Sequence, residues 1–200
     1  MMILGLTACG TTAPVKRMNL LMATEAPIIT PLTVSEASET LSDFIRNHDT
    51  TVLYWWSNTC PCVRRYQERV EQLAHKYQTK GVGFIAVASN SDDSIYGILE
   101  TASARKLQLP IAIDKDGVWA TSLRVTRTPT VLLINNMGQI LFTGWIDNER
   151  KQGEPDRIPY LENAILANLH GMTAPSNSPI RGCQITRFAL RTGPDCHCTE

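Results

Sequence analysis

One apolar segment that leads directly into a cysteine pair constrains this chain more than any other feature. Residues 51–56 are apolar and aromatic, a polar turn covers 57–59, and Cys60-Pro61-Cys62 opens a segment with helical periodicity. This pattern predicts a buried strand followed by a helix, with Cys60 at the helix N-terminus. Unpaired N–H groups and the positive end of the helix dipole favour a thiolate there. Because the thiolate is the nucleophilic form of cysteine, the segment predicts a reactive sulfur.

The rest of the chain alternates between apolar runs and amphipathic stretches. Periodicity predicts helices over 35–47, 63–78, 94–105, 118–123 and 158–169, and extended segments over 51–56, 82–88, 109–113, 130–134 and 139–146. This order predicts an α/β domain with a central, mostly parallel sheet, helices on both faces and an antiparallel edge. Sites in such sheets lie at the carboxyl ends of strands, which is where Cys60 falls.

The composition argues against several classes of function. Lys and Arg together number 19, as do Asp and Glu, so the formal net charge is zero. This balance gives no support for nucleic-acid binding. No run approaches the ~20 apolar residues that a membrane-spanning helix needs. The four tryptophans fit a core or groove wall better than a cofactor site, so no cofactor is expected.

The N-terminal sequence suggests that the protein is located in the cell envelope. Residues 6–9, Leu-Thr-Ala-Cys, resemble a bacterial lipobox. The resemblance implies cleavage before Cys9, lipidation of that cysteine and a membrane anchor facing the periplasm or the outside. No Lys or Arg precedes the short apolar part, so a truncated signal and a cytosolic protein with a chance apolar start both remain open. The expected division is signal 1–9, flexible tether 10–33, domain 34–170, and a linker with a cysteine-containing tail over 171–200.

The residues before the strand at 130–134 indicate a particular fold. Thr128-Pro129 precedes this strand, and Cys60 lies at a strand–helix junction. A chain with both features resembles the thioredoxin fold, a three-layer α/β sandwich with a central mixed sheet. The resemblance implies a cis Thr128–Pro129 bond in a loop that faces the reactive cysteine and lines a substrate-peptide groove. Thr128, Pro129, Arg127 and Trp56 are therefore expected to bind substrate; a solvated arginine and a core tryptophan are the alternatives.

Four short motifs, in order, are similar to bacterial redoxin-type proteins of the alkyl hydroperoxide reductase/thiol-specific antioxidant family. They are Thr-Cys-Pro-Cys-Val-Arg at 59–64, Phe-Thr-Gly-Trp-Ile-Asp at 142–147, Pro-Tyr-Leu at 159–161 and Gly-Cys-Gln-Ile at 182–185. The resemblance covers residues 35–185 and implies a thiol oxidoreductase.

The roles of three cysteines follow from this resemblance and the helix position. Cys60 is expected to be the nucleophile; an inert buried thiol is the alternative. Cys62 lies two residues after Cys60, which departs from the Cys-x-x-Cys spacing of thioredoxins. It either resolves a Cys60 disulfide or packs where the family usually has an aromatic residue. Cys183 lies beyond a flexible linker and either swings to Cys60 as a resolving thiol or makes a structural contact.

Three functions are compatible with these residues. The first is an envelope thiol–disulfide oxidoreductase, with a protein or small-molecule disulfide or thiol as substrate and an unidentified electron donor. The second is a thiol peroxidase, although Leu53 stands where peroxiredoxins have a signature proline. The third is a copper(I)-binding module that uses Cys60 and Cys62, with or without the cysteines at 196–198.

A cluster of soft ligands, Cys196-His197-Cys198, lies near the C-terminus. Thiolate and imidazole suit copper(I) or zinc, but three ligands so close in sequence do not readily complete a tetrahedral zinc site. A frayed tail with chance cysteines is the simpler interpretation, and no metal is predicted.

Overall fold

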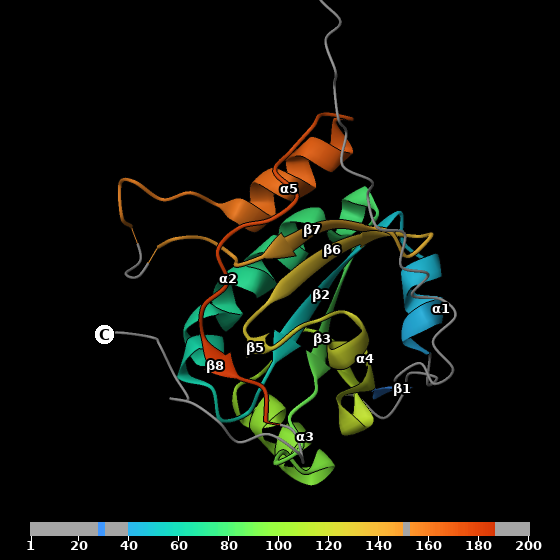
Figure 1. Ribbon diagram of the computed structural model, residues 1–200, viewed down its shortest axis with the longest axis vertical. Helices are drawn as coiled ribbons and strands as arrows, with labels where there is room; N and C mark the ends of the chain where they lie inside the picture. Colours follow the sequence, from blue (N-terminus) through green and yellow to red (C-terminus); the bar gives the residue numbers. More distant parts are fainter. Residues whose placement is uncertain (1–27, 31–39, 150–152, 187–200) are drawn as a thin grey trace, which may run out of the picture.

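A six-stranded mixed sheet organises the molecule (Figure 1). The computed structural model describes residues 28–30, 40–149 and 153–186. The strand order is β1-β4-β3-β2-β6-β7. Strands β2, β3 and β4 run parallel, while β1 and β6 are antiparallel to their neighbours, as is β7 to β6. The strands are β1 (Ile28–Thr30), β2 (Thr50–Trp56), β3 (Val82–Ala88), β4 (Ile111–Ile113), β6 (Val131–Asn135) and β7 (Ile140–Gly144). The predicted central mixed sheet with an antiparallel edge is confirmed.

Helices cover both faces of this sheet, and alternate residues of β2 enter the two cores between them. The α-helices are α1 (Leu41–Arg46), α2 (Pro61–Tyr77), α3 (Ile95–Ala104), α4 (Val118–Ser122) and α5 (Tyr160–Leu169), and 3₁₀ turns cover Gln78–Lys80 and Lys115–Gly117. Tyr54 and Trp56 pack with residues of α2, α3 and α5, whereas Leu53 and Trp55 pack with residues of α1 and α4. Because both faces of β2 are covered, every residue of the strand is buried, and Val52–Trp56 is apolar or aromatic. No helix in the described ranges is long and apolar enough to cross a membrane.

The N-terminal part of the domain differs from the prediction in two places. Residues 28–30, expected to belong to the tether, form an edge strand that pairs with β4. The first helix begins at Leu41 rather than at 35, because the Thr40 side chain caps it by accepting a hydrogen bond from the Asp43 N–H at 3.1 Å.

The chain stays packed on the domain beyond residue 170, where a linker and tail were predicted. Asn177 bridges to Thr143 on β7, and Ser178 Oγ accepts a 2.9 Å hydrogen bond from the Trp145 N–H. The chain then crosses the molecule to β8 (Cys183–Gln184), which pairs with the two-residue strand β5 (Arg127–Thr128) (Figure 1). The predicted domain end at 170 is therefore too early, because two short strand pairings that local sequence does not reveal extend it.

A buried carboxylate joins the end of β4 to α4. Asp114, 3% exposed, accepts hydrogen bonds from Ser89 Oγ at 2.6 Å and from the Trp119 and Ala120 N–H groups at 2.9 Å. We expect Asp114→Ala to lower the free energy of unfolding by about 2–4 kcal/mol, because it leaves buried donors unpaired. Urea denaturation measures the loss. Lys115→Ala, at an exposed neighbour, is the control, and an equal shift in both variants would contradict the assigned role.

Candidate active site

Cys60 lies at the carboxyl end of β2 and is the N-cap residue of α2, with Pro61 in the first turn. The strand–helix junction predicted from the sequence is confirmed. The turn at 57–59 is held by Arg105, which donates hydrogen bonds to Ser57 O at 3.4 Å and to Asn58 O at 2.6 Å. The Cys60 side chain is only 2% exposed, so a rigid turn presents a sulfur that neighbouring segments almost cover.

The loop after α4 faces this sulfur. The Thr128–Pro129 peptide bond is cis, as predicted. Cys60 Sγ lies 3.2 Å from Thr128 O, to which the thiol donates a hydrogen bond. Thr128 is 1% exposed, and Thr130 Oγ1 donates to Arg127 O at 2.7 Å, which fixes the loop. The expected position of the loop opposite Cys60 is confirmed.

The C-terminal segment covers the same place. Strand β8 pairs with β5 so that Cys183 lies opposite Thr128. The Ile185 N–H donates to Thr126 O at 2.9 Å, which continues the pairing by one residue. Arg127 Nη1 donates to Gly182 O at 2.7 Å. These contacts place the Cys183 side chain, 8% exposed, directly at Cys60.

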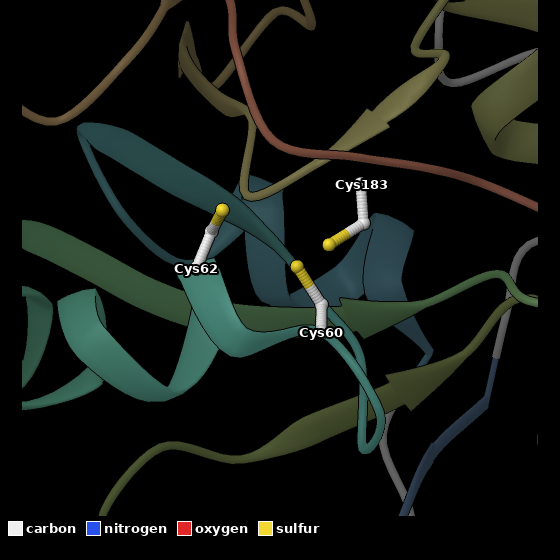
Figure 2. A group of neighbouring side chains, drawn as sticks. All are labelled: Cys60, Cys62 and Cys183. Carbon is white, nitrogen blue, oxygen red and sulfur yellow. The ribbon is translucent and has the colours of Figure 1, made fainter. Parts of the chain in front are cut away.

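Three sulfurs meet at this point. The Sγ atoms of Cys60, Cys62 and Cys183 all lie within 4.8 Å of one another. Figure 2 shows the Cys60 and Cys183 sulfurs pointing toward each other, while the Cys62 side chain points to one side. Cys60 and Cys183 are thiols, whereas Cys62 is disulfide-bonded. Three thiolates at this spacing suit a soft metal such as copper(I), but a third thiolate requires reduction of the Cys62 disulfide.

The surroundings of Cys60 favour its thiolate. Its pKa is lowered from the usual 9.0 to about 6, chiefly because the Cys183 thiol donates a hydrogen bond to the Cys60 sulfur. Burial opposes this by penalising the charge. The Thr128 hydroxyl and the N–H groups of Val63 and Cys183 then contribute further lowering. Val63 N–H is one of the unpaired donors at the start of α2. The thiolate expected at the N-terminus of α2 is thus stabilised mainly by Cys183, on β8.

Other predicted site residues have different surroundings. Trp56 is fully buried in the core under α2, so the expected substrate contact is not supported. Arg127 holds the backbone of the tail at Gly182 rather than pointing at the sulfur. Cys9, like Cys196, His197 and Cys198, lies outside the described residues.

Sequence reasoning missed one residue that connects the site. Asn90 Nδ2 donates to Ser57 Oγ at 2.7 Å and to Asp93 Oδ2 at 3.1 Å, while Asn90 Oδ1 accepts from Thr186 N–H at 3.2 Å. It therefore links the turn before Cys60 to the tail after Cys183. Burial raises the pKa of Asp93 beside it. The only signal for Asn90 in the sequence was that it follows the apolar run at 82–88, at the carboxyl end of a predicted strand.

Comparisons with known proteins agree with this geometry. The Redoxin family model matches residues 22–159. The thioredoxin-like protein SkfH of Bacillus subtilis is 28% identical over 105 residues, which are 52% of this chain and 74% of that protein. The thiol-disulfide oxidoreductase ResA of Halalkalibacterium halodurans is 30% identical over 89 residues, 44% of this chain and 49% of its own length. The chain thus spans about half of that oxidoreductase.

A solved structure of a hypothetical protein from Sinorhizobium meliloti superposes with a TM-score of 0.69 at 21% identity. It covers 83% of this chain and 93% of its own. At this identity the likeness speaks for the fold alone. The fold is a thioredoxin-like α/β sandwich in which a cis-proline loop lies opposite Cys60. The chain belongs to the Redoxin family.

The role of Cys183 in the acidity of Cys60 can be tested directly. With a pKa of about 6, roughly nine-tenths of Cys60 is thiolate at pH 7, against about one-hundredth for a pKa of 9. Cys183→Ala removes the hydrogen-bond donor, so we expect the Cys60 pKa to rise by about one unit or more. Cys183→Ser keeps a donor and retains most of the lowering.

The measurement is the ultraviolet absorbance of the thiolate against pH, with Cys60→Ser as the blank. Equal midpoints in the alanine and serine variants at position 183 would show that the Cys183 donor does not set the Cys60 pKa.

Proposed function

We propose that this protein is a thiol–disulfide oxidoreductase in which Cys60 is the nucleophile and Cys183 the resolving thiol. The observation that carries the proposal is the pair of buried thiols held within 4.8 Å of each other by β8, one of them with a lowered pKa. Cys183 is held opposite Thr128 on β5, whose carbonyl oxygen accepts from Cys60, so the two buried sulfurs are placed to cycle between dithiol and disulfide. The relatives named as thiol-disulfide oxidoreductases support the same class of activity.

The chemistry balances as two exchanges. The Cys60 thiolate attacks one sulfur of a substrate disulfide, forming a mixed disulfide and releasing the other sulfur as a thiolate, which takes up a proton. Cys183 then loses its proton and attacks the Cys60 sulfur, which forms the Cys60–Cys183 disulfide and releases the second substrate thiol. An external dithiol reduces that disulfide for the next cycle. The reverse sequence oxidises a substrate dithiol.

Cys183 suits the resolving role better than Cys62. The Cys183 thiol is hydrogen-bonded to the Cys60 sulfur, and Figure 2 shows the two sulfurs facing each other. Cys62 is fully buried within α2 and its sulfur is already in a disulfide. A resolving thiol must approach the mixed disulfide in line, and a sulfur on a separate strand reaches that position without unwinding a helix.

We further propose an envelope location, with a lipid on Cys9 at the end of the lipobox-like residues 6–9. The Cys62 disulfide fits an oxidising compartment. Protein or small-molecule disulfides of that compartment are the proposed substrates. Labelling of the chain with a radioactive fatty acid, absent in Cys9→Ala, tests the anchor.

Reduction of insulin disulfides by dithiothreitol tests the activity. We expect Cys60→Ser to fall to the rate of dithiothreitol alone, because the nucleophile is lost. Cys183→Ser should accumulate a mixed disulfide on Cys60, because the first exchange proceeds without the second. Cys62→Ser is the matched control and should keep most of the activity.

Full activity in Cys60→Ser would refute the proposed nucleophile. Trapping of the mixed disulfide by Cys62→Ser instead of Cys183→Ser would transfer the resolving role to Cys62.

A further inference from the structure

The strand β5 does not pair with any strand of the six-stranded sheet. It is two residues long and belongs to a separate two-stranded sheet, in which β8 is its partner. Thr128, the second residue of β5, contacts the nucleophile through its carbonyl oxygen. Whatever pairs with β5 therefore lies next to the Cys60 sulfur. In this structure that position is taken by the chain's own C-terminal segment.

The register of this pairing places a sulfur where a substrate sulfur has to be. Cys183 lies opposite Thr128, and its side chain approaches Cys60. An extended segment of another protein, added antiparallel to β5, would carry its own cysteine to the same position. Unpaired strand edges accept extended peptides through backbone hydrogen bonds, with alternate side chains giving specificity. Strand β8 and such a segment cannot occupy the edge together.

Hydrogen bonds, one arginine and the buried side chain of Ile185 hold the segment that contains β8 in place. The bonds outside the β5 register run from Ile185 N to Thr126 O, from Ser91 N to Thr186 O and from Thr186 N to Asn90 Oδ1. Most residues between 171 and 182 are exposed. Residues 182–186 are buried or half-buried, but their ladder with β5 is separate from the six-stranded sheet, so the segment can leave β5 without breaking a strand pairing of that sheet.

Gly182 lies where the segment that contains β8 comes closest to the backbone of β5. Its φ is +100°, and a Cβ at this position would overlap Thr128 O and lie 3.0 Å from the Trp145 ring. A side chain here forces the segment away from β5. Gly171 offers a matched control, because it also has a positive φ, +63°, but a Cβ added there would meet nothing within 4 Å.

We propose that β8 is a displaceable internal strand, and that an extended segment of a disulfide-bearing protein substrate replaces it on β5 to reach Cys60. This rests on the proposed function. The substrate segment enters, Cys60 forms the mixed disulfide, and the return of β8 brings Cys183 to the Cys60 sulfur. The same movement resolves the disulfide and expels the substrate thiol from the β5 edge. Small disulfides do not need the edge and are therefore less affected by β8.

The test compares two disulfides in the full chain carrying Cys183→Ser, which isolates the first exchange. One is dithiobis(nitrobenzoate), a small aromatic disulfide; the other is an extended peptide whose single cysteine carries thionitrobenzoate. Both release a coloured thiol. Adding Gly182→Ala should raise the rate with the peptide about tenfold, because loss of roughly one or two net backbone hydrogen bonds opens the edge. Both rates are measured at about pH 10, where Cys60 is mostly thiolate with or without the donor at position 183. The rate with the small disulfide should then change by no more than about twofold, less than the loss of one such hydrogen bond would give.

Gly171→Ala in the same background should leave the ratio of the two rates unchanged. Equal acceleration of both disulfides by Gly182→Ala, or slower reaction of the peptide, would overturn the proposal. If Gly182→Ala does not fold, Thr186→Pro serves as a second variant, because it removes the N–H that donates to Asn90. It should raise the rate with the peptide about threefold, which corresponds to losing part of the free energy of one hydrogen bond. No change in that variant would also overturn it.

Cys60→Ser in the same background separates the two proposals. Colour release that persists without Cys60 refutes the proposed function. Release that depends on Cys60, with a ratio of rates unmoved by Gly182→Ala and Thr186→Pro, refutes only the displaceable strand.

Discussion

The pairing of β8 with β5 is the contact on which the chemistry of this site depends. Two residues at 183–184 join two residues at 127–128, and this short ladder brings a thiol from the end of the chain to a sulfur at the start of α2. Without it, Cys60 would lose the donor that contributes most to its acidity. The segment at 183–184 is thus part of the candidate active site, although it is separated from Cys60 by more than half of the sequence.

Opposing effects set the state of the Cys60 sulfur. Burial and the hydrogen bond from the thiol to Thr128 O favour the neutral thiol. The Cys183 thiol and backbone N–H groups favour the thiolate, and their effect is larger. Because the pKa is lowered on folding from 9.0 to about 6, the stabilisation is fully present above pH 9. It is lost as the pH falls through about 6. The site therefore gives up stabilisation in mild acid at the same pH at which it loses its nucleophile.

The parts of this site that depend on local sequence could be predicted. The approach of Cys183 to Cys60 was one of two alternatives that the family resemblance left open, and the strand pairing that holds it was not predicted. The apolar run before Cys60 and the proline after it specify a strand–helix junction, and Thr128-Pro129 indicated the opposing loop. Strand β8 has only two residues, too few for periodicity, so its partner could not be inferred. Trp56 was misassigned because β2 is covered on both faces, and an apolar strand does not tell a groove wall from a core. Asn90 carries no motif and matters only through its three contacts.

The central claim is that Cys60 and Cys183 form the working dithiol. Its most direct test is the connectivity of the disulfide formed when the reduced protein is oxidised in a glutathione buffer, quenched with acid and mapped by mass spectrometry of proteolytic fragments. The account predicts that the first fragment pair to appear joins Cys60 to Cys183. A first disulfide between Cys60 and Cys62, with Cys183 still recovered as a thiol, would contradict it.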